Sequence, residues 1–382
     1  MAQRLAQEGK GEISTARAWL VAIAATLAMS VSYIDRQILA VLGKSVREAL
    51  SIDMTGFGYL ASAFSIAYLV AAPISGILVD RFGARRSLVV AILFWSAVSA
   101  AHALVPTFGA LFALRIALGT AEAPSFPSAA QAIKRILPAR HRSAGYGLLF
   151  TGSSIGAMVA VPLAIQIKEA HGWRAAFLIG SIVGLVWLPF WLLATSGDAV
   201  GERLAKPNAD ERFETDTPKW TVLADPAVHR AVVLVMSAAP AIMFVLIFAP
   251  QFLEKTYRLS EKEIGHYAWL PPVFFDIGAI VFGAIASRRD PSPTREKVRS
   301  QPELTAVAGV LLSLIALAAY APTPWTATII ASLALAGGGA INARLTADMI
   351  ARIDPAHVST AGGLCAAAQS LAYIVASPLV GR

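Results

Sequence analysis

The chain has 382 residues, of which 56% are hydrophobic and 15% are charged. Its mean hydropathy of +0.62 excludes an ordinary soluble globular domain and predicts an all-α membrane protein. The net charge of +8 does not predict a nucleic-acid partner, because the basic residues lie between apolar runs rather than in one patch. The single cysteine, Cys365, excludes a disulfide framework within the chain.

Apolar runs that are long enough to cross a bilayer recur along the whole chain, since a spanning helix needs roughly 20 residues. The predicted spans of the first half are 18–43, 55–79, 87–105, 108–133, 144–167 and 175–195. Those of the second half are 230–253, 264–286, 303–321, 325–348 and 358–380. We therefore expect about eleven spans in contact with the lipid bilayer.

A polar stretch at 196–228 separates these two groups of spans. It is rich in Asp, Glu, Lys and Pro, which is typical of a linker. The sequence thus predicts an N-terminal six-helix half at 1–195, a cytoplasmic linker at 196–228 and a C-terminal half at 229–382. Loops predicted to lie inside contain most of the Lys and Arg residues, which places the N-terminus in the cytoplasm.

The first predicted span contains two adjacent charges, Asp35 and Arg36, in the stretch Tyr-Ile-Asp-Arg-Gln. At about 1.5 Å per residue, Asp35 lies about 24 Å from Trp19 and inside the hydrocarbon. Each such charge costs roughly 2.5–3.5 kcal/mol on insertion scales. The two charges either neutralise each other or line a wet cavity. We favour the cavity, because structural need alone rarely places two charges inside a spanning helix.

A loop rich in glycine and arginine connects the second and third predicted spans. Its notable residues are Gly76, Asp80, Arg81, Gly83, Arg85 and Arg86. The glycines permit close approach and a tight turn. The Asp and the arginines can form charge pairs that close one face of the protein and break when it opens. The pattern G-x-x-x-D-R-x-G-x-R-R resembles the signature loop of the major facilitator superfamily. That resemblance implies two six-helix halves with twelve spans in total. Since only about eleven are predicted here, we expect that the twelfth span is missing.

The fourth predicted span contains a second pair of charges, Arg115 and Glu122. They are seven residues apart, so they share a helix face and lie about 10 Å apart along the axis. Because this span runs inward, Arg115 lies at a depth similar to that of Asp35, and the two could meet across a central cavity. A proton-coupling site formed by Asp35, Glu122 and Arg115 is one interpretation. The alternative is a static ion-pair network that stabilises the bundle.

Three motifs narrow the resemblance: Y-I-D-R-Q, R-x-x-x-G-x-x-E-A-x-x-F-P and H-G-W-R-A-A-F. They resemble the anion:cation symporter family. Within it, the bacterial hexuronate transporters are resembled by Y-I-D-R-Q and, in the second half, by residues 268–271 and 276–278. The resemblance implies that Arg36 binds the substrate carboxylate and that Asp35 and Glu122 carry protons. It also implies that Arg115 pairs with one of these acids and that Tyr68 lines the sugar site.

The chemistry of a sugar acid supports this assignment, because the planar guanidinium of arginine suits a carboxylate. Its hydroxyl groups need aromatic, hydroxyl or amide partners. The candidates are Tyr33, Tyr68, Ser153, Gln251, Asn342 and Gln369. The last four are equally well explained as polar groups in helix packing. Galactonate-type relatives have an Asn where this chain has Ala366, which leaves the sugar open.

The remaining features predict no further chemistry. The six histidines lack metal-ligand spacing and no catalytic triad occurs at matching depth, so we expect neither a metal site nor an enzyme. Residues 337–339, all glycine, predict helix flexibility or close packing rather than phosphate binding. Asp276 is either a third ionisable site or a polar anchor. We expect no cofactor beyond the proton as coupling ion.

The sequence therefore predicts a monomeric secondary transporter of the bacterial inner membrane. It would couple protons to the uptake of an organic monocarboxylate anion, a hexuronate or a related sugar acid. Two alternatives stay open: an organic anion exchanger of the same fold, and a non-transporting receptor, which the missing twelfth span suggests.

Overall fold

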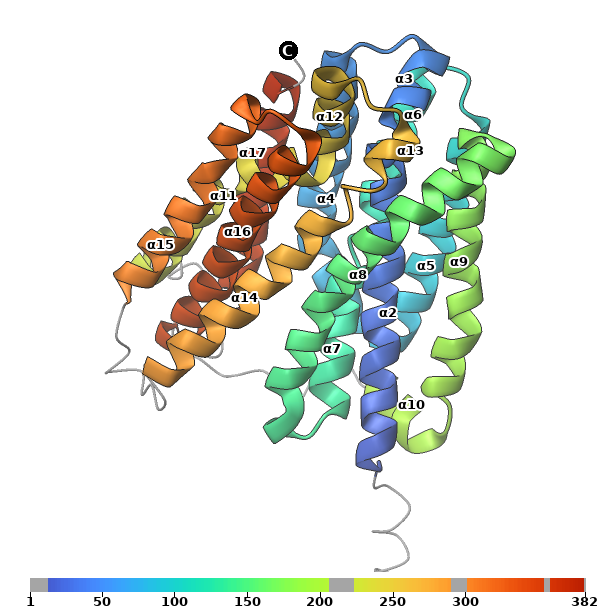
Figure 1. The fold of residues 1–382 in the computed structure, drawn as a ribbon. Coiled ribbons are helices and arrows are strands. Elements are labelled where there is room, and N and C mark those ends of the chain that lie inside the picture. Colours follow the sequence, from blue (N-terminus) through green and yellow to red (C-terminus); the bar gives the residue numbers. More distant parts are fainter. Residues whose placement is uncertain (1–12, 206–222, 290–300, 354–357, 381–382) are drawn as a thin grey trace, which may run out of the picture.

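The computed structural model describes residues 13–205, 223–289, 301–353 and 358–380. Within these ranges every element of regular structure is a helix, which confirms the predicted all-α class. The helices form two groups that follow the order of the chain (Figure 1).

The first group of helices corresponds to the six predicted spans of the first half. Its long helices are α2 (Thr15–Val41), α4 (Met54–Phe82), α5 (Ala84–Ala101), α6 (Phe108–Glu122), α7 (Ser125–Ile136), α8 (Ala139–His171) and α9 (Trp173–Ala194). Two short helices, α3 (Gly43–Leu50) and α10 (Asp198–Ala205), and the 3-10 turn η1 (His102–Leu104) complete it. The fourth predicted span is divided between α6 and α7 at Pro124, because proline cannot donate an amide to the helix ladder.

The second group corresponds to the five later spans. Its elements are α11 (Pro226–Met243), the π-helical turn η4 (Phe244–Phe248), α12 (Ala249–Tyr257), α13 (Glu261–Ile264), α14 (Leu270–Arg289), α15 (Pro302–Ser313), the 3-10 segment η5 (Leu314–Tyr320), α16 (Pro324–Arg352) and α17 (Val358–Val380). The span predicted from residue 264 begins later, at Leu270. Pro271 and Pro272 follow directly and suit a first helical turn.

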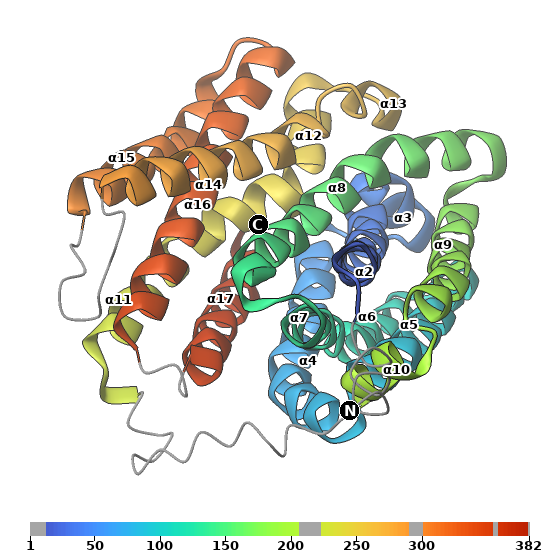
Figure 2. The same cartoon turned by 90° about the horizontal axis from the view of Figure 1, so that it is seen from below.

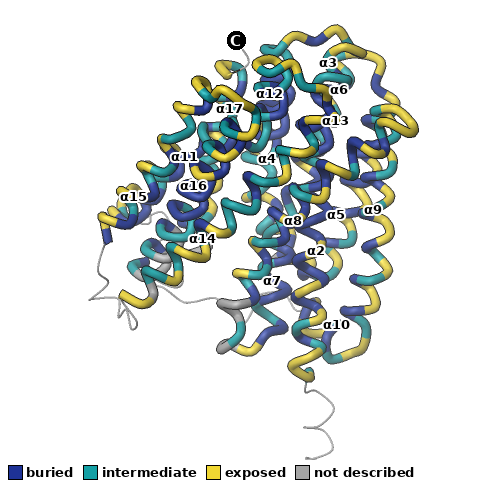
Figure 3. The backbone as a smooth tube through the Cα atoms, viewed as in Figure 1, coloured by how far each residue is buried: buried dark blue, intermediate teal, exposed yellow. Residues whose placement is uncertain are grey.

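Nine helices among the described residues are long and apolar enough to cross a membrane. The apolar part of α14 is shorter, and α6 with α7 is interrupted. Large apolar side chains such as Ile77, Val90 and Leu193 are 65–70% exposed. Exposed positions recur along the helices of both halves (Figure 3). So much exposed apolar surface is typical of a protein that contacts lipid.

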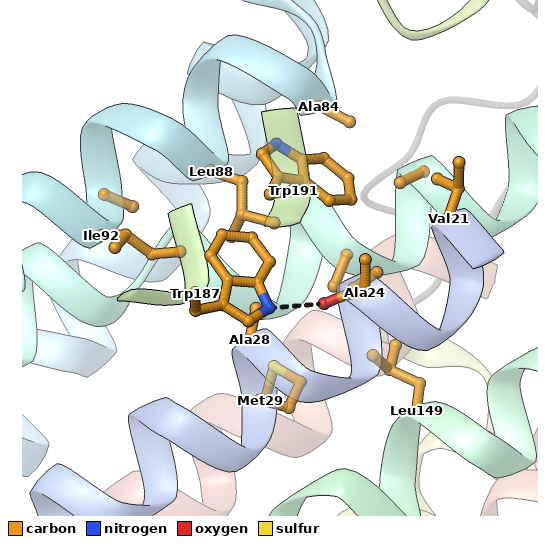
Figure 4. Close-up of a cluster of buried hydrophobic side chains, with 14 of the residues drawn as sticks. Val21, Ala24, Ala28, Met29, Ala84, Leu88, Ile92, Leu149, Trp187 and Trp191 are labelled. Carbon is orange, nitrogen blue, oxygen red and sulfur yellow. Dashed lines mark hydrogen bonds between the residues drawn. The ribbon is translucent and has the colours of Figure 1, made fainter. Parts of the chain in front are cut away.

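Each half has a hydrophobic core of its own. In the first half Trp187 and Trp191 of α9 stack 5.5 Å apart on residues of α2 and α5, and the Trp187 indole donates a 3.0 Å hydrogen bond to the Ala24 carbonyl (Figure 4). A second core in the other half lies between α11, α15, α16 and α17. A third, which we name the shared cluster, joins residues of both halves, including Ile38 and Phe57 with Phe248.

The three consecutive glycines of α16 allow three neighbouring helices to pack closely. An added Cβ at Gly337 would overlap the Ala308 carbonyl of α15, and one at Gly339 would overlap the Phe275 carbonyl of α14. A Cβ at Gly338 would lie 2.9 Å from Ile242 of α11. Close packing, the second interpretation given to this motif, therefore describes its role in the structure.

We expect Gly339→Ala to destabilise the protein, because its methyl group has to displace the backbone of α14. Overpacking of this kind costs about 1–3 kcal/mol. Thermal unfolding in detergent, followed by tryptophan fluorescence, measures the effect. Gly309→Ala is the matched control, since a Cβ there meets nothing within 4 Å. Equal melting temperatures of the two variants would contradict the packing role.

Polar contacts between the halves gather at the end of the molecule that carries α3, α12 and α13. The Glu261 carboxylate, 4% exposed, accepts hydrogen bonds from the Ser45 amide at 2.9 Å and hydroxyl at 2.7 Å, and pairs with Lys168 at 2.9 Å. Glu254 pairs with Arg47 at 2.8 Å. Further pairs are Lys44–Glu254 at 3.6 Å and Lys262–Glu169 at 3.5 Å. We name this set of residues the clamp.

The helices of the two halves spread apart toward the opposite end, which carries α7 and α10 (Figures 1 and 2). The stretch predicted as a linker, 196–228, contains α10 and the start of α11, and its residues 206–222 lie outside the described part. Val200 and Leu204 of α10 are buried, and the helix packs on α5 and α7. The structure is therefore closed at the clamp and diverges toward α10.

Candidate functional site

The centre of the first half holds an ion pair between α2 and α6. The Arg36 Nε lies 2.5 Å from Oε2 of Glu122, whose side chain is fully buried. The Ser32 hydroxyl, one turn before Arg36, donates to the same oxygen at 2.8 Å. A buried carboxylate is thereby held by one guanidinium and one hydroxyl, both from α2.

Three aromatic rings surround the Arg36 guanidinium. Its central carbon lies 4.9 Å from the ring centre of Tyr33, 4.8 Å from that of Phe64 and 5.1 Å from that of Tyr68. Phe64 and Tyr68 are one turn apart on α4 and stack at 5.9 Å. Cation–π contacts of this kind hold a cation in place without neutralising it. Tyr33 and Tyr68, both predicted substrate contacts, therefore lie beside Arg36.

Asp35 is bonded to a different helix, α5. Its Oδ1 accepts a 2.8 Å hydrogen bond from the Ser99 hydroxyl, and the residue is 1% exposed. Its Oδ2 has no hydrogen-bond partner in the described part of the chain. Adjacent in sequence, Asp35 and Arg36 do not neutralise each other directly, because each has a partner on a different helix.

Arg115 differs from the expectation that it pairs with one of the two acids. Among the described residues it forms neither a hydrogen bond nor an ion pair, and it is 5% exposed. Its guanidinium carbon lies 5.1 Å from the ring centre of Phe64. The direct partners of Glu122 are instead Arg36 and Ser32. A shared depth in the membrane, the basis of that expectation, does not by itself select the partner.

In the described part of the chain, none of the other predicted substrate contacts is hydrogen-bonded to Arg36. Gln251 is buried and donates to the Ala40 carbonyl at 2.8 Å, so it joins α12 to α2 near the clamp. Asn342 bonds to Gly338 of its own helix at 3.3 Å. Ser153 is half-buried on α8. Gln369 of α17 donates to the Tyr373 hydroxyl at 3.3 Å, and Tyr373 in turn lies near enough to Tyr33 and Arg36 to interact with them electrostatically.

A largely apolar pocket lies between the halves beside Gln37, and its lining includes neither Arg36 nor Glu122. Asp276 of α14 connects the two halves, because its Oδ1 accepts a 2.8 Å hydrogen bond from the Ser154 hydroxyl of α8. It is therefore a polar contact between the halves, consistent with the anchor interpretation.

The loop between the second and third predicted spans, which we predicted to act as a gate, contains Gly83 with φ +80°, in the region that favours glycine. Gly83 ends α4, and an added Cβ there would overlap the Leu204 carbonyl of α10. The Arg85 Nε donates to Thr195 at 3.0 Å, and Arg81 lies over Phe82 at 5.6 Å.

Three further residues of this loop were predicted to take part. The Asp80 side chain lies outside the described part, Arg86 is exposed, and an added Cβ at Gly76 meets nothing within 4 Å. The charge pairs of the loop thus stay a prediction.

Sequence reasoning missed four residues of the central network: Ser32, Phe64, Ser99 and Tyr373. Ser32 could have been found, because it shares a helix face with Arg36 at a spacing of four. Phe64 could have been found from its spacing of four to Tyr68. Ser99 gave no signal, since isolated serines are common in spanning helices.

The model of the Major Facilitator Superfamily matches residues 25–377. The chain therefore belongs to the Major Facilitator Superfamily, a class of membrane transporters, and it is not an enzyme. A solved bacterial homologue of the human lysosomal transporter Spinster has the same fold, with a TM-score of 0.80 at 17% identity, covering 97% of this chain and 83% of that one.

Curated relatives place the chain more closely. It is 29% identical over 276 residues to the hexuronate transporter of Escherichia coli K12, covering 69% of this chain and 64% of that relative, less than two thirds of its length. A galacturonate transporter of Dickeya chrysanthemi is 28% identical, covering 69% and 80%. A probable galactarate/D-glucarate transporter of Bacillus subtilis is 26% identical over 350 residues, covering 84% and 76%.

Proposed function

We propose that this protein is a proton-coupled symporter of a monocarboxylate sugar acid, a hexuronate or a close relative, in the bacterial inner membrane with its N-terminus in the cytoplasm. The observation that carries the proposal is the buried pair of Arg36 and Glu122 inside an aromatic enclosure. Relatives named as transporters of hexuronate and galacturonate support the substrate class.

The pair couples two events because a substrate carboxylate and the Glu122 carboxylate compete for one guanidinium. When Glu122 is ionised, Arg36 is occupied. Protonation of Glu122 removes the negative charge, and Arg36 can then bind the carboxylate of the substrate with its planar fork. Asp35, on the same turn of α2, is the second proton carrier of the proposal.

The aromatic rings serve the rest of the ligand. Tyr33 and Tyr68 flank Arg36 and offer hydroxyl groups to a polyol. Gln369 and Tyr373 on α17 offer an amide and a hydroxyl from the other half. A ligand that contacts both halves favours their closure over it. When the clamp is released, the clamp end opens while the end that carries α10 closes.

Uptake of labelled glucuronate into proteoliposomes tests the proposal, with and without an inward proton gradient. We expect labelled glucuronate to accumulate only when the gradient is present, and we expect Arg36→Ala to abolish this accumulation. Arg230→Ala is the matched control, since Arg230 is exposed and pairs loosely with Asp348 at 3.6 Å.

Three other outcomes would each change the assignment. Flux that ignores the gradient and needs a counter-anion would indicate an exchanger. Saturable binding without flux would indicate a receptor, and neither binding nor flux would show that the substrate class is wrong.

A further inference from the structure

Phe64 is shared by the two arginines of the central network. The guanidinium carbon of Arg36 lies 4.8 Å from the ring centre, and that of Arg115 lies 5.1 Å from the same centre. The ring is 9% exposed and stacks on Tyr68. One aromatic side chain on α4 therefore contacts cations that belong to α2 and α6.

The contact matters most to Arg115. Arg36 has Glu122 and two further rings, whereas Arg115 has no hydrogen bond or ion pair among the described residues, and two of its nitrogens are buried. Glu122 and Asp35 act on Arg115 only at longer range. A buried cation that lacks a direct ion pair is costly, and the negative face of an aromatic ring attracts it most strongly where water is excluded. Among the described residues, the Phe64 ring thus makes the close contact that holds the Arg115 guanidinium.

Backbone packing places Phe64 against α6. Gly119 of α6 lies against the Phe64 carbonyl, and an added Cβ there would overlap that oxygen. Gly119 lies between Arg115 and Glu122 in sequence, one turn from each. The backbone of Phe64 therefore lies directly against α6, which keeps the base of its side chain beside Arg115 and Glu122.

We propose that Phe64 is a positioning residue which, by holding Arg115, reserves Glu122 for Arg36. Without the ring, Arg115 would turn to the nearest carboxylates, and Glu122 lies two turns along its own helix. Arg36 would then be free while Glu122 is still ionised, and substrate binding would no longer need a proton. This inference rests on the proposed symport.

Several titratable and charged groups surround Glu122 and Arg115 from the neighbouring helices. They are Tyr33, Asp35 and Arg36 of α2, Tyr68 of α4 and His102 of η1. The His102 ring bonds through Nδ1 to the Val98 carbonyl at 2.8 Å, and its Nε2 has no hydrogen-bond partner in the described part. Each of these groups is unchanged in the variants below, so a difference between variants reports the ring.

The test compares the pH dependence of glucuronate binding to purified protein in three variants. In the wild type, affinity should fall by about tenfold for each pH unit above the midpoint of the measured binding profile. Phe64→Leu should bind with an affinity that changes by less than about threefold over the same range, and should lose uphill accumulation. Phe64→Trp, which keeps a π face, should restore the wild-type profile.

Phe57→Leu is the matched control, because Phe57 lies seven residues earlier on α4, is 1% exposed and packs on Phe248 rather than on an arginine. A wild-type pH profile in Phe64→Leu would overturn the inference, as would an equal change in Phe57→Leu. If the wild type itself binds without pH dependence, the proposed symport is wrong. That failure is distinguishable from failure of the Phe64 inference, because it is seen in the wild type alone.

Discussion

Glu122→Gln should abolish uphill accumulation of substrate while exchange across the membrane continues. Glutamine matches glutamate in shape but carries no charge and releases no proton, so it imitates the protonated state permanently. Arg36, which Glu122 holds at 2.5 Å, would be available to substrate at every pH. One pH unit drives about tenfold accumulation per proton carried, and this whole factor should disappear.

Two assays on the same proteoliposomes separate these effects. Counterflow, with unlabelled substrate inside and labelled substrate outside, should proceed in the variant at a rate close to wild type. Uptake driven by a proton gradient should stop at the equilibrium distribution. Glu48→Gln, which removes an exposed charge on α3, is the control and should accumulate normally. Retained accumulation in Glu122→Gln would exclude this acid as the coupling group.

Glu261→Ala should shift the protein toward a state that is open at the clamp. The change leaves Lys168 and the Ser45 amide without their acceptor. Hydrogen bonds to a charged group contribute about 1.5–3 kcal/mol, which corresponds to a shift of roughly tenfold to hundredfold between the two states. Because transport needs both states, the maximal uptake rate should change while folding is preserved.

A cysteine at Ser377 reports the shift, in a background where Cys365 is replaced by serine. Ser377 is fully buried and packs against Gly58 of α4 where the two halves meet. A charged maleimide should alkylate this cysteine at least several-fold faster in Glu261→Ala.

The control for this experiment is Glu263→Ala, two residues away. Glu263 is exposed and serves only the capping box of α13, where bonds from the amide and hydroxyl of Ser260 lower the pKa of its carboxyl. Equal labelling rates in the two variants would show that the clamp does not restrain the halves.

Much of the fold could be predicted from the sequence, because bilayer thickness imposes a length on every apolar run. The first and third spans were predicted at 18–43 and 87–105, and the helices there are Thr15–Val41 and Ala84–Ala101. The short helix α10 was missed, since its eight residues bury only Val200 and Leu204 and lie in a stretch of polar composition.

The sequence predicted which charged residues form the site, but not which of them form an ion pair. Spacing along a helix gives depth, whereas the rotation of one helix against another decides which groups touch. Gln251 illustrates a second limit. The π-helical turn Phe244–Phe248 precedes it, so the face it presents cannot be inferred from an unbroken period of 3.6 residues. In the structure its side-chain amide donates to the Ala40 carbonyl and so joins α12 to α2.

The shared cluster gives the conformational change a thermal signature. Opening the clamp end has to part Phe57 from Phe248, now 5.9 Å apart, and to let water reach apolar surface that both halves bury. Hydration of apolar surface adds about 0.45 cal/K/mol of heat capacity per Å². The equilibrium between the two states should therefore curve with temperature, and cooling should favour the state in which this surface meets water.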